Sequence, residues 1–303
     1  FLLLVFLFFM LIYLPFFLFS GVEGQLGQCF AAVAEEFPKI KLIFTDQNEV
    51  DITHPETLKK SFDSRPFDGI INCAAYTQVD FAEEEYEKAN KINVEGLSNI
   101  GVFAEKKELC VVNFSSDYVF DGTSMIPYKE NDKPNPINKY GYSKYKGELL
   151  LKKSSCQHIT FRISWLFSPF GENFVKTILK LSKLRKTIQV VNDQHGRPTY
   201  GIDLARTVLK LISNNTIYTF PILHYANQGV CSWKEFAEAI VNELECKTIV
   251  QGITTLAYPT SAIRPKYSIL DTGRIEKEFQ IEIPTWHESL KKCIQILKSD
   301  GSL

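Results

Sequence analysis

Apolar and polar positions alternate along this chain in two distinct patterns. Short apolar runs are typical of buried strands, and longer stretches with an apolar stripe every three or four residues are typical of helices. The apolar runs are Pro15 to Phe19, Lys41 to Thr45, Gly69 to Cys73, Leu109 to Phe114, His158 to Ile163 and Thr187 to Val191. The predicted helices span residues 25–36, 84–107, 138–153, 172–184, 201–213, 232–244 and 285–297. Alternating strands and helices predict an α/β fold, a Rossmann-type doubly wound parallel sheet with a smaller C-terminal α/β region.

The start of the chain is unusually apolar. Residues 1–19 carry no charge, and nineteen apolar residues are long enough to span a bilayer. No basic residue precedes this stretch, although signal peptides and membrane anchors normally carry one. We therefore expect an apolar tail, residues 1–14, before a buried first strand, in a cytoplasmic protein. Membrane anchoring through residues 1–19 stays open as the alternative.

Composition narrows the class of protein. The chain has 303 residues, of which 45% are hydrophobic and 23% charged, as in ordinary globular proteins. Lys and Arg number 34 against 35 Asp and Glu, so no basic excess indicates a nucleic-acid partner. The seven cysteines and five histidines are widely spaced, and we expect no metal site among them.

A glycine motif follows the first predicted strand. Gly21, Gly24 and Gly27 form GxxGxxG, the pattern of a loop that binds a dinucleotide pyrophosphate at a helix N-terminus. Asp46 ends the second predicted strand about 20 residues on, where a carboxylate can accept the adenosine ribose hydroxyls. No Arg or Lys stands beside Asp46 to bind a 2′-phosphate, which favours NAD over NADP. Asp46 as a simple turn residue stays open.

A second group of residues predicts proton transfer. Ser116 lies at the end of a predicted strand, and Tyr140 and Lys144 form a YxxxK pair at the start of a predicted helix. Positions i and i+4 share one helical face. A nearby ammonium lowers the pKa of a phenol, so Tyr140 can donate a proton to a carbonyl. The Ser116 hydroxyl can stabilise the developing charge on the same oxygen.

Motifs along most of the chain resemble one family. The sequence resembles the extended short-chain dehydrogenases/reductases, and among them the dTDP-4-dehydrorhamnose reductase family. The matching stretches are GxxGQLG (21–27), VDIT (50–53), NCAAYTQVDFAE (72–83), INVEG (92–96), SSDYVFDG (115–122), PYKENDKPNPINKYGYSKYKGE (127–148), FRISWLF (161–167), NFVKTIL (173–179), VVNDQHGRPTY (190–200) and YPTSAIRP (258–265).

The resemblance implies a reaction and a set of site residues. It implies NADPH- or NADH-dependent reduction of the 4-keto group of dTDP-4-dehydro-L-rhamnose to dTDP-L-rhamnose. The catalytic residues would be Tyr140 as proton donor, Lys144, and Ser116, where the family usually has Thr. The cofactor would contact Gly21, Gly24, Gln25, Leu26, Gly27, Asp46, Asp51, Ile52, Ala74, Ala75 and Tyr76, besides Tyr140 and Lys144. The dTDP-sugar would contact Ser116, Asp117, Trp165 and Arg264.

The resemblance also bears on organisation and partners. Residues 15–165 would form the NAD(P)-binding domain, to which the chain returns near residues 187–225. Residues 166–303 would form an interleaved sugar-nucleotide region. A homodimer and Mg²⁺ are suggested by the resemblance alone. Two other functions stay open: a non-catalytic regulatory subunit like the β subunit of methionine adenosyltransferase, and a related sugar-nucleotide epimerase or dehydratase.

Overall fold

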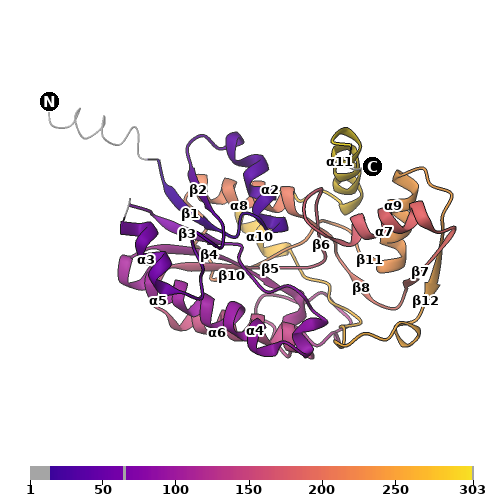
Figure 1. The fold of residues 1–303 in the computed structure, drawn as a ribbon, viewed down its shortest axis with the longest axis horizontal. Helices are drawn as coiled ribbons and strands as arrows, with labels where there is room; N and C mark the ends of the chain where they lie inside the picture. Colours follow the sequence, from indigo (N-terminus) through magenta and orange to yellow (C-terminus); the bar gives the residue numbers. More distant parts are fainter. Residues whose placement is uncertain (1–13, 64–65, 302–303) are drawn as a thin grey trace.

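Six parallel strands form the centre of the molecule (Figure 1). The structure, a computed structural model, describes residues 14–63 and 66–301. Across the sheet the strands follow the order β2-β1-β3-β4-β5-β10. They are β1 (Phe16–Ser20), β2 (Lys41–Thr45), β3 (Gly69–Asn72), β4 (Cys110–Ser116), β5 (His158–Ile163) and β10 (Ile222–Tyr225). The strand order reverses between β1 and β3, and such a switch point opens a crevice at the carboxyl edge of the sheet.

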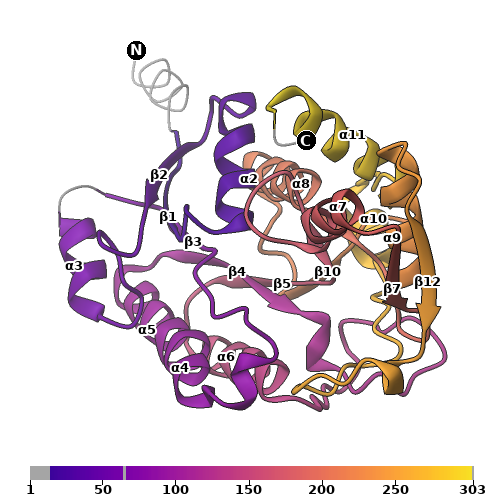
Figure 2. The same ribbon diagram turned by 45° about the vertical axis from the view of Figure 1, so that its right-hand side comes forward.

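Both faces of the sheet are covered, which is why its strands are apolar runs rather than alternating ones. All four residues of β3 are buried, as are four of the five in β1. Figure 2 shows α2 (Gln25–Val33) and α8 (Gly201–Ser213) over one face. Helices α3 (Pro55–Asp63), α5 (Leu97–Lys107) and α6 (Lys139–Lys153) cover the other. Each layer therefore buries its own apolar core against the sheet.

The C-terminal half forms a smaller lobe beside the sheet (Figure 1). Its principal pairing joins β7 (Thr187–Val191) to β12 (Ile249–Ile253) in parallel. Its remaining elements are β6 (Leu166–Phe167), β8 (His195–Gly196), β9 (Thr199–Tyr200), β11 (Cys231–Ser232), α7 (Phe174–Leu184), α9 (Trp233–Glu243), α10 (Gly273–Phe279) and α11 (Trp286–Ser299). The predicted α/β fold with a parallel sheet is thus confirmed.

The structure corrects several predicted elements. The helix predicted over residues 84–107 is interrupted: α4 (Tyr86–Asn90) is followed by a π-helical turn, Lys91–Gly96, before α5 begins. Helix α3 was not predicted, because Leu58 is its only buried residue and its apolar stripe is correspondingly faint. The last strand of the sheet, β10, was also missed as an element, because the polar His224 interrupts its short apolar run.

The apolar N-terminus is only partly visible. The tail expected over residues 1–14 lies, except for Leu14, outside the described residues. The first strand predicted at Pro15 to Phe19 is present, displaced by one residue. Between residues 14 and 301, apart from 64–65, no helix combines the length and the hydrophobicity needed to cross a bilayer.

A buried ion pair ties α6 to the sheet. Arg162 on β5 and Glu148 on α6 are both buried, with side chains 2% and 5% exposed. The guanidinium donates from Nε to Oε1 at 3.0 Å and from Nη2 to Oε2 at 2.7 Å. The bidentate geometry satisfies both charges away from water. Removing either partner would leave the other buried and unpaired.

We expect Glu148→Gln to lower the free energy of unfolding by about 3–5 kcal/mol, because the Arg162 charge would lose its partner in a buried site. Urea unfolding followed by circular dichroism measures this loss. Glu172→Gln is the matched control, since it breaks an exposed pair with Lys180 and should leave the unfolding midpoint unchanged. Equal effects of the two substitutions would contradict the assigned role of the buried pair.

Candidate active site

The glycine motif forms the turn between β1 and α2. Gly21 has φ +81°, and a Cβ atom there would lie 2.7 Å from the backbone nitrogen of Ala74. A Cβ at Gly27 would run into the carbonyl oxygen of Gly21, so this glycine lets α2 pack directly on the turn. Gly24 is the N-cap of α2, and the first turn of the helix holds no acidic residue. The helix therefore directs free N–H groups and a positive dipole end at the carboxyl edge of the sheet.

A crevice of about 210 Å³ opens at the ends of β1, β2 and β3. It brings together seven of the predicted cofactor residues: Gly21, Gly24, Asp46, Asp51, Ile52, Ala74 and Ala75. Its other lining residues are Glu23, Gln47, Val50, Thr53, Cys73 and Ile92. The order of the strands in the sheet thus brings three strand ends and one glycine turn together in a single site.

Other predicted cofactor residues point elsewhere. The Gln25 side chain donates from Nε2 to the carbonyl of Leu166 at 3.4 Å. Leu26 and Gly27 are buried in α2. The Tyr76 hydroxyl donates to Glu85 Oε2 at 3.1 Å, so its ring lies outside the lining of the crevice.

The carboxylates of the crevice are held by local hydrogen bonds. Asp46 Oδ1 accepts from the backbone nitrogens of Asn48 at 2.8 Å and Glu49 at 2.9 Å, so Asp46 also stabilises the turn after β2. Asp51 Oδ1 accepts from the nitrogen and the hydroxyl of Thr53. Burial raises the pKa of Asp51, but these hydrogen bonds outweigh it and the pKa is lowered. Both roles considered for Asp46, turn residue and crevice wall, are compatible with this geometry.

Ser116, Tyr140 and Lys144 meet at the end of β4. Asn138 caps α6 by accepting from the Gly141 nitrogen at 2.7 Å, and one helical turn then separates Tyr140 from Lys144. The Ser116 hydroxyl is near enough to the Tyr140 phenol to act on its pKa. The Ser116 hydroxyl donates to Asp117 Oδ1 at 3.0 Å. The residues of the YxxxK pair and the strand-end serine therefore form one cluster.

Burial, rather than mutual charge, dominates the electrostatics of this cluster. Burial raises the pKa of Tyr140 to about 12, against the lowering effect of the nearby Ser116 hydroxyl. Burial lowers the pKa of Lys144 to about 8, opposed by the nearby Glu148 carboxylate. The sequence led us to expect a lowered phenol pKa, and in this structure the direction is the opposite. The reason is that the phenolate would have to form away from water.

Asp117 is more deeply enclosed than a substrate-facing residue. Asp117 is only 2% exposed, and its Oδ2 atom has no hydrogen-bond partner within the described chain. Burial raises its pKa to about 7, while the hydrogen bond from Ser116 acts in the lowering direction. Asp117 therefore lies behind Ser116 and next to Tyr118 and is shielded from solvent.

Sequence reasoning missed the residue that joins the strand ends to α6. Asn93, in the π-helical turn, accepts from the Tyr76 nitrogen at 2.9 Å and donates to the Tyr76 carbonyl at 3.0 Å. The same amide donates to the Ser143 hydroxyl at 2.9 Å. Asn93 thereby holds the segment after β3 against the helix that carries Tyr140 and Lys144. The INVEG stretch (92–96) contains this asparagine and contributes to the family resemblance, but it indicates no role for Asn93.

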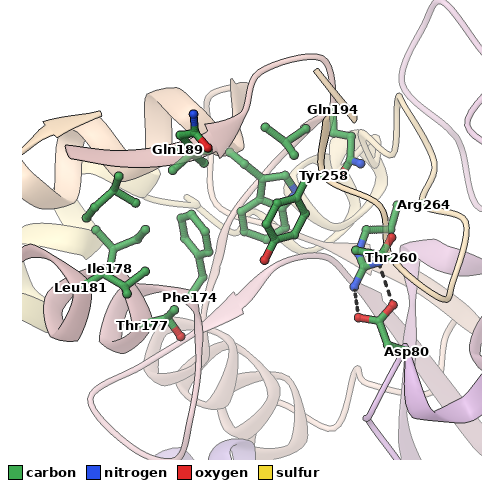
Figure 3. A pocket seen from close by; sticks show the side chains of 14 residues that line it. Asp80, Phe174, Thr177, Ile178, Leu181, Gln189, Gln194, Tyr258, Thr260 and Arg264 are labelled. Atoms are coloured by element: carbon green, nitrogen blue, oxygen red, sulfur yellow. Dashed lines mark hydrogen bonds and ion pairs between the residues drawn. The ribbon is translucent and has the colours of Figure 1, made fainter. Parts of the chain in front are cut away.

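A second cavity, of about 340 Å³, lies between the sheet and the C-terminal lobe (Figure 3). Residues of α7 and β7, Trp233 and the loop around Tyr258 form its walls. Its lining is Asp80, Phe174, Thr177, Ile178, Leu181, Ile188, Gln189, Val190, Val191, Gln194, Trp233, Tyr258, Thr260 and Arg264. Of the four residues predicted to contact a sugar nucleotide, Arg264 lines this cavity, and it is paired with Asp80.

Trp165 lies behind the wall of this cavity. Its ring stacks on Trp233 with centroids 3.5 Å apart and an angle of 10° between the planes. Its backbone has φ +47°, and a Cβ at Gly196 would contact its ring at 2.5 Å. Trp233 is thus the indole that faces the cavity, and Trp165 supports it. Nothing local in the sequence indicates this pairing, since 68 positions separate the two residues.

Among residues 14–63 and 66–301, no group of three or more His, Cys, Asp and Glu side chains is arranged to hold a metal ion. The Mg²⁺ suggested by the resemblance therefore has no support in the described part of the chain.

Comparison with known proteins gives consistent results. The family model described as RmlD substrate binding domain matches residues 17–299. A relative named dTDP-4-dehydrorhamnose reductase, from Aggregatibacter actinomycetemcomitans, is 39% identical over 90% of this chain and 96% of its own. The spore coat polysaccharide biosynthesis protein SpsK of Bacillus subtilis is 36% identical over 92% of this chain and 96% of its own.

Solved structures agree with these relatives. A dTDP-4-dehydrorhamnose reductase from Clostridium acetobutylicum superposes with a TM-score of 0.89 at 37% identity, covering 93% of this chain and 99% of that one. A reductase of the same name from Bacillus anthracis, in complex with NADP, gives 0.88 at 35% identity, covering 94% and 100%. A dTDP-glucose 4,6-dehydratase from Streptomyces venezuelae, 16% identical with a TM-score of 0.79 over 95% and 98%, shares the fold.

Proposed function

The chain belongs to the RmlD substrate binding domain family and is an oxidoreductase, and we propose that it reduces dTDP-4-dehydro-L-rhamnose to dTDP-L-rhamnose. The reductant is NADPH or NADH. One observation carries the proposal: Ser116, Tyr140 and Lys144 form a buried cluster beside the glycine-lined crevice. Cys73 links the two parts, because it lines the crevice and interacts with the Lys144 charge.

The crevice fits a dinucleotide. At Gly21 a Cβ would collide with the backbone of Ala74, so glycine there lets the turns that follow β1 and β3 approach each other closely at the crevice. The N-terminus of α2 favours negative charge, as a pyrophosphate requires. Asp46 and Asp51 stand at the far end of the crevice, where they would face the adenosine ribose. The relative from Bacillus anthracis was solved in complex with NADP, which supports a nicotinamide cofactor here.

The residues of the cluster have distinct roles in the proposed reduction. A nicotinamide held in the crevice would supply the hydride that reduces carbon 4 of the sugar. Tyr140 donates its hydroxyl proton to the carbonyl oxygen, which becomes the 4-hydroxyl, and the phenolate left behind regains a proton from solvent. Ser116 hydrogen-bonds the same oxygen and stabilises its developing charge. Lys144 binds the nicotinamide ribose, and its ammonium stabilises the phenolate.

The decisive experiment measures cofactor oxidation with dTDP-4-keto sugars and with their UDP and GDP counterparts. We expect turnover with the dTDP-linked 6-deoxy-4-keto sugar and much slower turnover with the others. A lack of turnover with every nucleotide sugar would support the non-catalytic regulatory subunit instead. Tightly retained cofactor and epimerised or dehydrated product would support the related epimerase or dehydratase.

Tyr140→Phe should reduce kcat by about 10²–10⁴-fold, the usual contribution of a positioned general acid. Cofactor affinity should persist, because the ring and its packing against Tyr118 are retained. Steady-state kinetics and cofactor titration by fluorescence measure the two effects. Retention of most of the wild-type kcat would exclude Tyr140 as the proton donor.

Lys144→Met should weaken both turnover and cofactor affinity, because a ribose contact and the stabilising charge are lost. Since the pKa of Lys144 is lowered to about 8, its ammonium is present below that pH and is lost above it. Wild-type cofactor affinity should therefore fall as the pH rises through about 8, while the Met variant shows no such step. Lys153→Met, at an exposed position of the same helix, is the control. An unchanged cofactor affinity in Lys144→Met would remove Lys144 from the site.

NADH should be used at least as well as NADPH. Glu23, Asp46 and Asp51 line the crevice, and its lining among the described residues includes no Lys or Arg, so a 2′-phosphate would be repelled. Asp46→Asn keeps an oxygen for the turn but removes the charge, and should shift the kcat/KM ratio toward NADPH. A strong wild-type preference for NADPH would show that the carboxylate does not face the ribose.

A further inference from the structure

A salt bridge spans the mouth of the second cavity. Asp80 belongs to the segment that follows β3, and Arg264 belongs to residues 258–264, which we call the strap (Figure 3). Arg264 donates from Nη1 to Asp80 Oδ1 at 2.9 Å and from Nη2 to Asp80 Oδ2 at 2.6 Å. The Ala262 nitrogen also donates to Asp80 Oδ1, at 3.1 Å. One carboxylate thus fixes both the side chain and the backbone of the strap.

The strap depends on such contacts for its position. It contains no helix or strand, so no backbone ladder fixes it. Besides the bonds to Asp80, Asn138 Nδ2 donates to the Ile263 carbonyl at 2.8 Å. Asn138 is the cap of α6, so the strap is held between the segment after β3 and the helix of Tyr140. Tyr258 and Thr260, which line the cavity, are carried by the same strap.

The guanidinium still has binding capacity directed away from Asp80. Arginine has five N–H donors in a rigid plane. Three of them are used, two by Asp80 and one from Nη1 to the Ala262 carbonyl at 3.2 Å. Within the described chain the remaining edge, Nε and the second hydrogen of Nη2, has no protein acceptor. Two parallel donors on one edge match the oxygens of a phosphate.

The charge on Asp80 is maintained at neutral pH. Its hydrogen bond with Arg264 is the main reason why the pKa of the carboxyl is lowered from its ordinary value. The Asp80 side chain is 41% exposed and that of Arg264 21%. Solvent therefore screens the pair, and the pair contributes little to the free energy of unfolding. Its geometric effect is larger, because a bidentate pair allows the guanidinium plane one orientation.

We propose that Asp80 is a positioning residue for the nucleotide sugar, which holds the strap over the cavity and orients the free edge of Arg264 toward the diphosphate. This inference rests on the proposed function, since it assigns the diphosphate of that substrate to this cavity. Asp80 itself touches neither the reacting carbonyl nor the cofactor crevice. Its loss should therefore act on substrate affinity and leave the chemical step unchanged.

Asp80→Asn tests the proposal. Asparagine keeps one acceptor but turns an NH₂ group toward Arg264, so the bidentate pair is lost while the volume is kept. We expect KM for the nucleotide sugar to rise about tenfold to a hundredfold, the range for losing a charge-assisted hydrogen bond, with kcat and cofactor affinity within about twofold of wild type. Titration calorimetry with dTDP alone should show the same loss without any chemistry.

Two controls separate positioning from general effects. Glu84→Gln removes one negative charge from the same segment at an exposed residue, and should leave KM unchanged. Asp80→Glu keeps the charge on a longer arm, and should raise KM less than Asp80→Asn does. In a double-mutant cycle, Asp80→Asn should cost less affinity in the Arg264→Ala background than in the wild-type background, because part of the effect of Asp80 acts through Arg264.

Three results would overturn the proposal. A lower KM in Asp80→Asn would mean that Asp80 competes with the diphosphate for Arg264. An unchanged KM, or an equal rise in Glu84→Gln, would mean that the pair does not position the substrate. If Asp80→Asn does not fold, Asp80→Glu decides through the same KM-against-kcat comparison. Failure of the proposed function is distinct, because the wild-type enzyme would then not turn over the nucleotide sugar.

Discussion

A row of polar side chains inside the sheet determines where the strand ends that border the site lie. Ser20, Asn72, Asn113 and Thr160 are in register on β1, β3, β4 and β5, and all four are buried. Hydrogen bonds of 2.9, 3.2 and 3.5 Å join them in sequence across the sheet. A slip of one residue would turn each side chain to the opposite face and leave buried amides unsatisfied, at about 1–3 kcal/mol each. The register of the strand ends is therefore strongly specified. Gly21, Cys73 and Ser116 follow this row directly or within three residues, and so their relative positions follow from it.

One further contact, made by Asn93, places the helix that carries Tyr140 and Lys144 against the strand ends. Asn93 holds α6 against the segment after β3, and Tyr140 and Lys144 then reach the end of β4 from one face of the helix. The same enclosure raises the pKa of the phenol to about 12 and lowers that of the amine to about 8. At neutral pH the tyrosine is protonated and most of the lysine is charged. Those are the states that the proposed roles of proton donor and ribose-binding cation require, so burial is compatible with these roles even though it does not lower the phenol pKa.

The features that could be predicted from the sequence are those that depend on residues close together along the chain. Strands over Lys41 to Thr45 and His158 to Ile163 were predicted with the bounds that the structure shows, because four to six apolar residues between turns are a local pattern. The glycine turn and the YxxxK pair were also local. The Asp80–Arg264 pair joins positions 184 apart, and the Trp165–Trp233 stack has no signature in either residue's surroundings. The direction of the Tyr140 pKa shift was missed for the same reason: it depends on burial, which is a property of the assembled fold.

The two cavities differ in the contacts that hold their walls in place. This difference determines which substitutions each cavity can accept without a change in the sheet. The cofactor crevice is built from backbone turns at the ends of β1, β2 and β3, whose positions follow from the sheet register. Changes there would disturb the fold together with binding. The second cavity is lined by side chains from four separate parts of the chain, near residues 80, 174–194, 233 and 258–264, and side-chain contacts such as the Asp80–Arg264 pair hold them together. Such contacts can be exchanged without moving the sheet. The lining of the second cavity can therefore change while the glycine-lined crevice and the sheet are preserved, which is consistent with a shared fold in the dehydratase of 16% identity.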